Sequence, residues 1–192
     1  MAAEKPTGYD GMNVYWAARD VEFSPVGNHH FVIMTFHSLE ESPNPAQTVT
    51  ISDERGRKIH VLCYALFLTV LDWGVEVKIN DDSDLKAYEE YFCNSQGLLW
   101  DFDFEGHKIP PPQGMDMPEF MRKINDAALK SQDYLAHHPG QYSYSFLERN
   151  CATWVNDLLA YVGVPDEVRR AQNDFFGLDL GAESTAFMST FR

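Results

Sequence analysis

The sequence predicts an α+β fold in which an antiparallel sheet from the first half of the chain packs against helices from the second half. Runs of β-branched and aromatic residues with the length of strands occupy residues 29–79. Apolar residues recur at helical spacing between residues 84 and 162, and turn-forming residues separate the runs. With 192 residues and 44% hydrophobic content, the chain can bury one sizeable core, so we expect a single domain over residues 1–192.

The first half of the chain reads as a sheet. Residues 1–28 show no clear period and are expected to form a loop, and the first strand follows at about 30–37. Residues 47–52 and 58–68 flank a turn and predict a β-hairpin, and residues 75–79 alternate strictly. We therefore expect these strands to form one antiparallel sheet.

The second half predicts helices. Residues 84–92 form a short amphipathic pattern, whereas residues 106–114 include three consecutive prolines and are expected to be a loop. Asp116-Met-Pro-Glu119 has the polar cap, early proline and returning acid of a helix start, and that helix ends at about His137. A last apolar stripe over 151–162 is closed by Gly163.

Charge and cysteine content exclude several classes of protein. The net charge is 15 − 29 = −14, which repels phosphate backbones and argues against a nucleic-acid partner. Three widely spaced cysteines fit a reducing compartment, and the first twenty or so residues offer no continuous apolar segment typical of a signal peptide. The longest apolar run, Val61–Leu71, is about half of a membrane span. We therefore expect a cytoplasmic location in the producing cell and no integral membrane contact.

Cys151 is the candidate nucleophile. Asn150 is a good N-cap, so Cys151 falls in the first helical turn, where backbone N–H groups and the helix dipole stabilise a thiolate and an oxyanion. The alternative, a small buried residue at a helix start, is the commoner role for an arbitrary cysteine. Cys63 lies inside an apolar strand and Cys93 trails a helix, so both are interpreted as structural.

A nucleophilic cysteine needs a base, and the pair His29-His30 opens a core strand where imidazoles are costly to bury. The remaining histidines considered, His107, His137 and His138, lie in expected loops or at a helix end without metal-ligand spacing. We therefore expect neither a metal nor a cofactor.

The stretches Gly27-Asn-His-His-Phe-Val-Ile and Tyr-x-Tyr-x-Phe-x-x-x-Asn-Cys-Ala-Thr-Trp-Val, the latter over Tyr142–Val155, resemble circularly permuted NlpC/P60-type papain-like proteins. These include the lecithin:retinol acyltransferase-like group. The resemblance covers about residues 27–165, the expected core, and implies a permuted papain-like fold. It also implies that Cys151 is the nucleophile and that His29 or His30 is the base.

Of the two histidines, His30 is preferred, because the strand face that it shares with Val32, Met34 and Phe36 is apolar, as needed to pack on the cysteine helix.

The resemblance also implies that a polar residue on a neighbouring strand orients the imidazole. The candidates are His60, Thr50 and Gln47, and His60 is preferred among them, although a half-buried strand histidine without a catalytic role is the commoner interpretation of such a residue.

The resemblance implies a cysteine hydrolase that cleaves amide bonds in peptidoglycan stem peptides. Without a signal peptide, such an enzyme is either phage-encoded or delivered into a target periplasm by a specialised machine, such as type VI secretion. In the second case it is an antibacterial toxin, and an immunity protein is its expected partner. Two alternatives remain open: a lipid acyltransferase, thioesterase or phospholipase of the same fold, and a catalytically silent binding domain.

Overall fold

The structure is a computed structural model that describes residues 11–20, 28–52, 56–69, 74–93, 104–138, 140, 142, 150–173 and 188. It is an α+β fold, with an antiparallel sheet and four α-helices in the described part of the chain. The strands are β1 (Asn13–Asp20), β2 (Asn28–Phe36), β3 (Val49–Ser52), β4 (Lys58–Leu68), β5 (Val75–Ile79) and β6 (Phe104–Lys108). The helices are α1 (Asp82–Cys93), α2 (Met117–His137), α3 (Cys151–Tyr161) and α4 (Asp166–Asn173), with a short 3₁₀ turn, η1, at Leu39–Glu41.

The strands form one sheet in the order β3-β4-β2-β1-β6, and β5 also pairs with β4. Every pairing is antiparallel. The predicted antiparallel sheet is confirmed for the strands at 30–37, 47–52, 58–68 and 75–79, while the hairpin turn at 53–55 lies outside the described residues.

The prediction of loops at 1–28 and 106–114 is wrong where β1 and β6 occur. β1 lies between β2 and β6 and is buried on both faces, with Trp16 on one and Tyr15 on the other, so its sequence lacks the polar alternation that reveals a strand. β6 ends before the run of prolines begins, and it places His107 in a strand opposite Trp16. Helix α4 was also not predicted.

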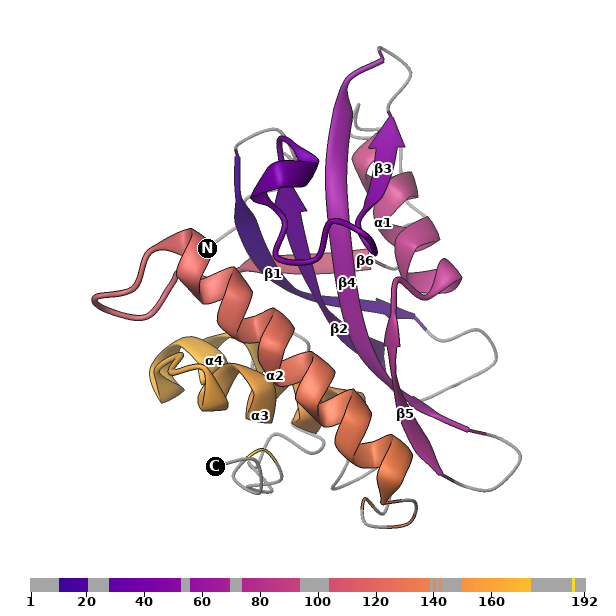
Figure 1. The fold of residues 1–192 in the computed structure, drawn as a ribbon, viewed down its shortest axis with the longest axis vertical. Coiled ribbons are helices and arrows are strands. Elements are labelled where there is room, and N and C mark those ends of the chain that lie inside the picture. The colour runs from indigo at the N-terminus through magenta and orange to yellow at the C-terminus, as the bar shows by residue number, and fades with distance from the viewer. Residues whose placement is uncertain are drawn as a thin grey trace.

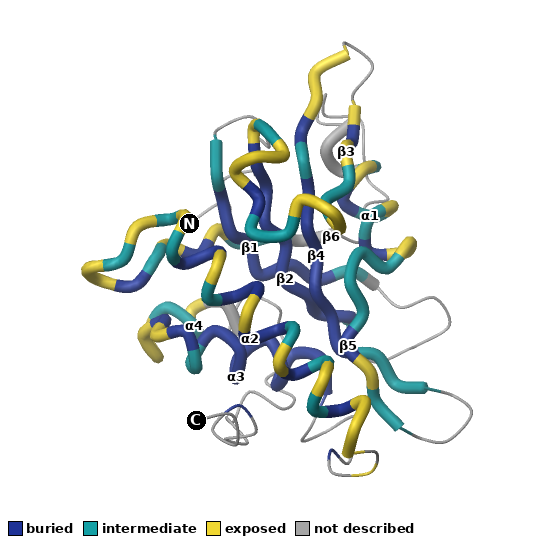
Figure 2. The backbone as a smooth tube through the Cα atoms, viewed as in Figure 1, coloured by how far each residue is buried: buried dark blue, intermediate teal, exposed yellow. Residues whose placement is uncertain are grey.

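Helices cover both faces of the sheet. Figure 1 shows α2, α3 and α4 on one side and α1 on the other. The first side buries Val32, Met34 and Phe36 of β2 with apolar residues of α2 and α3, and the second buries Phe31 and Ile33 with Tyr88 of α1. The helix that carries Cys151 therefore covers the face that carries His30, as expected. In Figure 2 the buried backbone runs through the central strands and α3.

Helices α2 and α3 begin where the sequence predicts, because each has a side-chain N-cap. Asp116 accepts a hydrogen bond from the Glu119 N–H at 2.8 Å, and Asn150 accepts one from the Thr153 N–H at 3.1 Å. The N-cap at Asn150 makes Cys151 the first residue of α3. No helix among the described residues is long and apolar enough to cross a membrane.

Candidate active site

The sulfur of Cys151 lies at the start of α3, against the first residues of β2. Its Sγ is 3.3 Å from the backbone N of His30, which donates to it, and 3.9 Å from the backbone O of Asn28. Burial alone raises the pKa of this thiol. The hydrogen bond and charge of His29, together with the N–H groups of His30 and Ala152, outweigh burial and lower the pKa of Cys151 below its ordinary value.

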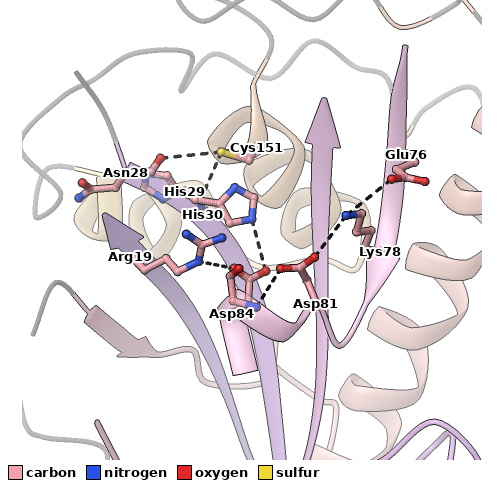
Figure 3. Close-up of polar contacts among 10 residues, drawn as sticks. Arg19, Asn28, His29, His30, Glu76, Lys78, Asp81, Asp84 and Cys151 are labelled. Carbon is pink, nitrogen blue, oxygen red and sulfur yellow. Dashed lines mark hydrogen bonds and ion pairs between the residues drawn. The ribbon is translucent and has the colours of Figure 1, made fainter. Parts of the chain in front are cut away.

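The imidazole of His29 lies between Cys151 and Asp84 (Figure 3). Its Nε2 is 3.3 Å from Asp84 Oδ2, so Nδ1 is the ring nitrogen left for the hydrogen bond with the Cys151 sulfur. The ring also packs against Phe67, with ring centroids 4.5 Å apart. Burial acts to lower the pKa of His29. The hydrogen bonds to Asp84 and Cys151 and the charges of both outweigh it and raise the pKa to about 9, so the imidazolium form is favoured at neutral pH.

Asp84 lies in the first turn of α1, on the opposite side of the sheet from α3, and its side chain is 0% exposed. Its Oδ1 accepts a hydrogen bond of 2.6 Å from Arg19 Nε, and its Oδ2 faces His29. The site therefore draws on both helical layers. The cysteine comes from one layer, the carboxylate from the other, and the histidine from the strand end between them (Figure 3).

His30, the preferred base, is the wrong choice on geometry. Its Nδ1 accepts a hydrogen bond from Trp16 Nε1 at 3.1 Å, and burial and the charge of His29 lower its pKa to about 3. A ring that stays neutral in this way does not provide an imidazolium for Cys151. The start of α3 lies at the N-terminal end of β2, so the Cys151 sulfur contacts the backbone N–H of His30 and the ring of His29.

His60 cannot orient His29, and this prediction is also wrong. His60 pairs with Phe36, which is 36 − 29 = 7 residues along β2 from His29, or about 23 Å at about 3.3 Å per residue. Thr50 bonds to His60 at 2.9 Å and so lies at the same distant end of the sheet. For Gln47, the third candidate, the structure gives a hydrogen bond from the Asn80 side chain to its backbone oxygen, and this contact does not connect it to His29.

The sequence reasoning missed Asp84 and Arg19. An acidic residue in the first turn of a helix is so common that Asp84 carries no local signal. Arg19 lies in the segment 1–28, for which the sequence predicts a loop. Once β1 is recognised as a strand, alternation places Arg19 on the buried face of Tyr15 and Ala17, and a charge on such a face calls for a partner.

The other cysteine with a described side chain does not share these features. Cys63 is buried in β4, and burial raises the pKa of its thiol well above the ordinary value. The side chain of Cys93 lies outside the described residues, as does most of the stretch from Tyr142 to Asn150. Within the described ranges no group of three or more histidine, cysteine or acidic side chains could hold a metal ion.

Chemically, the arrangement combines three groups. The Cys151 thiolate is stabilised at the N-terminus of α3, the His29 imidazolium lies beside it, and the buried Asp84 carboxylate contacts the imidazolium. Such a thiolate can attack a carbonyl carbon, and the imidazolium can protonate the leaving group. The first N–H groups of α3 have no intrahelical acceptor, so the Cys151 N–H is placed to receive an oxyanion. No protein-family model, curated protein or solved structure matches the chain.

Proposed function

We propose that the protein is a cysteine hydrolase that works through an acyl-enzyme on Cys151, with His29 as acid and base and Asp84 as its partner. The observation that carries the proposal is the position of the His29 ring between the Cys151 sulfur and the Asp84 carboxylate. A silent binding domain has no need to bury an ion pair of this kind, because burying charges is costly. The arrangement supports a permuted papain-like enzyme.

In the first half of the proposed reaction, the Cys151 thiolate attacks the substrate carbonyl carbon. A C–S bond forms, and the carbonyl π electrons move to oxygen, where the Cys151 N–H stabilises the oxyanion. When the carbonyl re-forms, the C–N bond breaks. The proton of His29 Nδ1 passes to the departing amine, which leaves a thioester on Cys151 and a neutral imidazole.

In the second half, the neutral His29 takes a proton from water as the water oxygen attacks the thioester carbon. A C–O bond forms, the C–S bond breaks, and the carboxylic acid product leaves. Cys151 returns to the thiolate and His29 to the imidazolium. Throughout both halves the Asp84 carboxylate stabilises the imidazolium whenever it forms.

The proposed substrate is an amide bond in a peptidoglycan stem peptide, on the strength of the resemblance to NlpC/P60-type proteins. The net charge of −14 also opposes adsorption to an anionic lipid surface, which disfavours the lipid-acting alternative. Delivery as an antibacterial toxin, with an immunity protein as partner, belongs to the same proposal and rests on the same resemblance.

The test is incubation of the purified protein with peptidoglycan sacculi and, separately, with phospholipid vesicles, followed by mass spectrometry of the products. We expect defined muropeptides from wild type and none from Cys151→Ala, because only the nucleophile is removed. Cys63→Ala is the matched control and should release the same muropeptides. Expression directed to the periplasm of a Gram-negative host should cause lysis with wild type and not with Cys151→Ala.

Each other outcome decides between classes. Release of fatty acid or lysophospholipid from vesicles, without muropeptides, would assign the site to lipid chemistry. Muropeptide release that persists in Cys151→Ala would remove the cysteine mechanism altogether.

A further inference from the structure

Arg19 is the cross-strand neighbour of His29. β1 and β2 pair with Arg19 directly opposite His29, so both side chains project from the sheet face that α1 covers. Arg19 Nε donates to Asp84 Oδ1 at 2.6 Å, and His29 Nε2 lies 3.3 Å from the other oxygen of the same carboxylate. One carboxylate therefore bridges a permanent cation and a titratable one.

The permanent cation is needed because Asp84 is buried. Its side chain is 0% exposed, and that of Arg19 only 15%. Burying a carboxylate is costly unless a partner compensates its charge. His29 compensates it only while protonated, whereas a guanidinium is charged at every working pH. During the proposed reaction His29 gives up its proton, and at that point Arg19 is the charge that compensates the Asp84 carboxylate.

Arg19 also sets the direction of the carboxylate. A charge-assisted hydrogen bond to Oδ1 restricts rotation of the carboxylate about its own axis. The bond leaves Oδ2 free to face His29. Without it, the carboxylate of Asp84 could turn away from the ring, since the two groups are joined by one contact.

The charges that face His29 come from several elements and alternate in sign. Arg19 approaches from β1, Asp84 from α1 and Cys151 from α3, while Phe67 covers the ring from β4 and the neutral His30 follows on β2. Arg19 and His29 are like charges, but Asp84 lies between them and contacts both. Losing Arg19 would relieve its screened repulsion of His29, but it would also weaken the direct attraction between Asp84 and His29 at 3.3 Å. The direct attraction is the larger effect.

We propose that Arg19 is a positioning residue of the Cys151 site, which compensates the charge of the buried Asp84 carboxylate and keeps it turned toward His29. This inference rests on the proposed function, because that function assigns Cys151 and His29 as the reacting pair. Arg19 acts on the sulfur through two intermediaries, so its effect should appear in the fraction of Cys151 present as thiolate.

Three substitutions separate the charge of Arg19 from its hydrogen bond. Arg19→Lys keeps the charge on a chain of similar reach, and Arg19→Gln keeps a donor nitrogen at the same place along the side chain without charge. Arg19→Met keeps the apolar stem alone. The readout is the rate of Cys151 alkylation by iodoacetamide at about pH 6.5. Only the thiolate reacts, so at this pH the rate depends on the fraction of Cys151 that is deprotonated. Peptide mass spectrometry measures it, with Cys63 as internal reference.

We expect Arg19→Met to slow the labelling of Cys151 about tenfold, as for the loss of about one pKa unit of thiolate stabilisation. Arg19→Lys should stay within about threefold of wild type, and Arg19→Gln should fall between the two. If Arg19→Met does not fold, as judged by thermal melting, Arg19→Gln carries the same prediction. A folded Arg19→Met, or in its place Arg19→Gln, that labels at the wild-type rate would overturn the proposal.

A double variant tests whether Arg19 acts through Asp84. In the Asp84→Asn background, Arg19→Met should cause no further loss of labelling, because the group that it positions is gone. A full multiplicative loss would show that Arg19 acts on its own and would also overturn the proposal. None of these readouts needs a substrate, so failure of the hydrolase proposal with sacculi and vesicles is distinguishable from failure of this one.

Discussion

Replacing Asp84 by Asn removes the negative charge beside His29 while keeping nearly the same shape. The surroundings of His29 raise its pKa from 6.5 to about 9, a difference of about 2.5. At about 1.4 kcal/mol per pKa unit, they stabilise the imidazolium by about 3 kcal/mol beyond the penalty of burial. A charge in contact with a titratable group accounts for about one to three units, so the pKa of His29 should fall by at least about one in Asp84→Asn.

The loss should be visible in two measurements. A histidine proton NMR titration should show the His29 midpoint moved down, because the charge is gone and Arg19 now faces the ring without a counter-charge. Labelling of Cys151 by iodoacetamide at about pH 6.5 should slow about tenfold or more, because the thiolate has lost its cation. Thermal melting checks that the variant is folded, since an ion pair to Arg19 is broken.

Asp81→Asn is the matched control. Asp81 is an acid close to Asp84 that pairs with Lys78 at 3.3 Å and accepts from the Ser83 N–H at 3.1 Å, a role that Asn can fill. It should change the labelling rate of Cys151 less than about twofold. If Asp84→Asn is folded and labels like this control, Asp84 does not support His29, and the three-residue site is refuted.

Further predictions concern the other cysteine, the two histidines and pH. Cys63 should label far more slowly than Cys151 below about pH 8, because burial raises its pKa, and equal rates in the intact fold would contradict this. His29→Ala should slow the labelling of Cys151 about tenfold or more, whereas His30→Ala should mainly lower the melting temperature; the reverse result would restore His30 as the partner. Hydrolysis should fall as pH rises through about 9, where His29 loses its proton, while alkylation should not. The pKa of His29 is raised in the folded state, so its contribution to stability is full below about pH 6.5 and is lost as the pH rises through about 9. The melting temperature measured across this pH range should fall accordingly.

Local signals in the sequence were sufficient to place Cys151 at the start of a helix. The N-cap at Asn150 and the apolar stripe after it predict a helix that begins at Cys151, and the structure has that helix. Capping depends on residues within one turn, which is why it can be read without knowledge of the fold. The four predicted strands were also readable locally, from their β-branched and aromatic runs or their alternation and from the turn residues between them.

The sequence does not predict β1, the strand that carries Arg19. β1 is buried by neighbours on both faces, so Trp16 and Tyr15 alternate with other apolar residues and no period remains. A loop over residues 1–28 gives Arg19 no defined face, so the sequence does not identify Asp84 as its partner.

The amino-acid sequence by itself determined a thiol at a helix start and an imidazole at a strand start, because both follow from contacts between near neighbours in the chain. Tertiary structure decided which imidazole meets the thiol. His29 and His30 point to opposite faces of β2, and α3 begins at the strand end, where Cys151 reaches the His29 ring. Tertiary structure also brought Asp84, 67 residues before Cys151, from the helix on the other side of the sheet. Charges so far apart in the chain become partners only when packing excludes water between them.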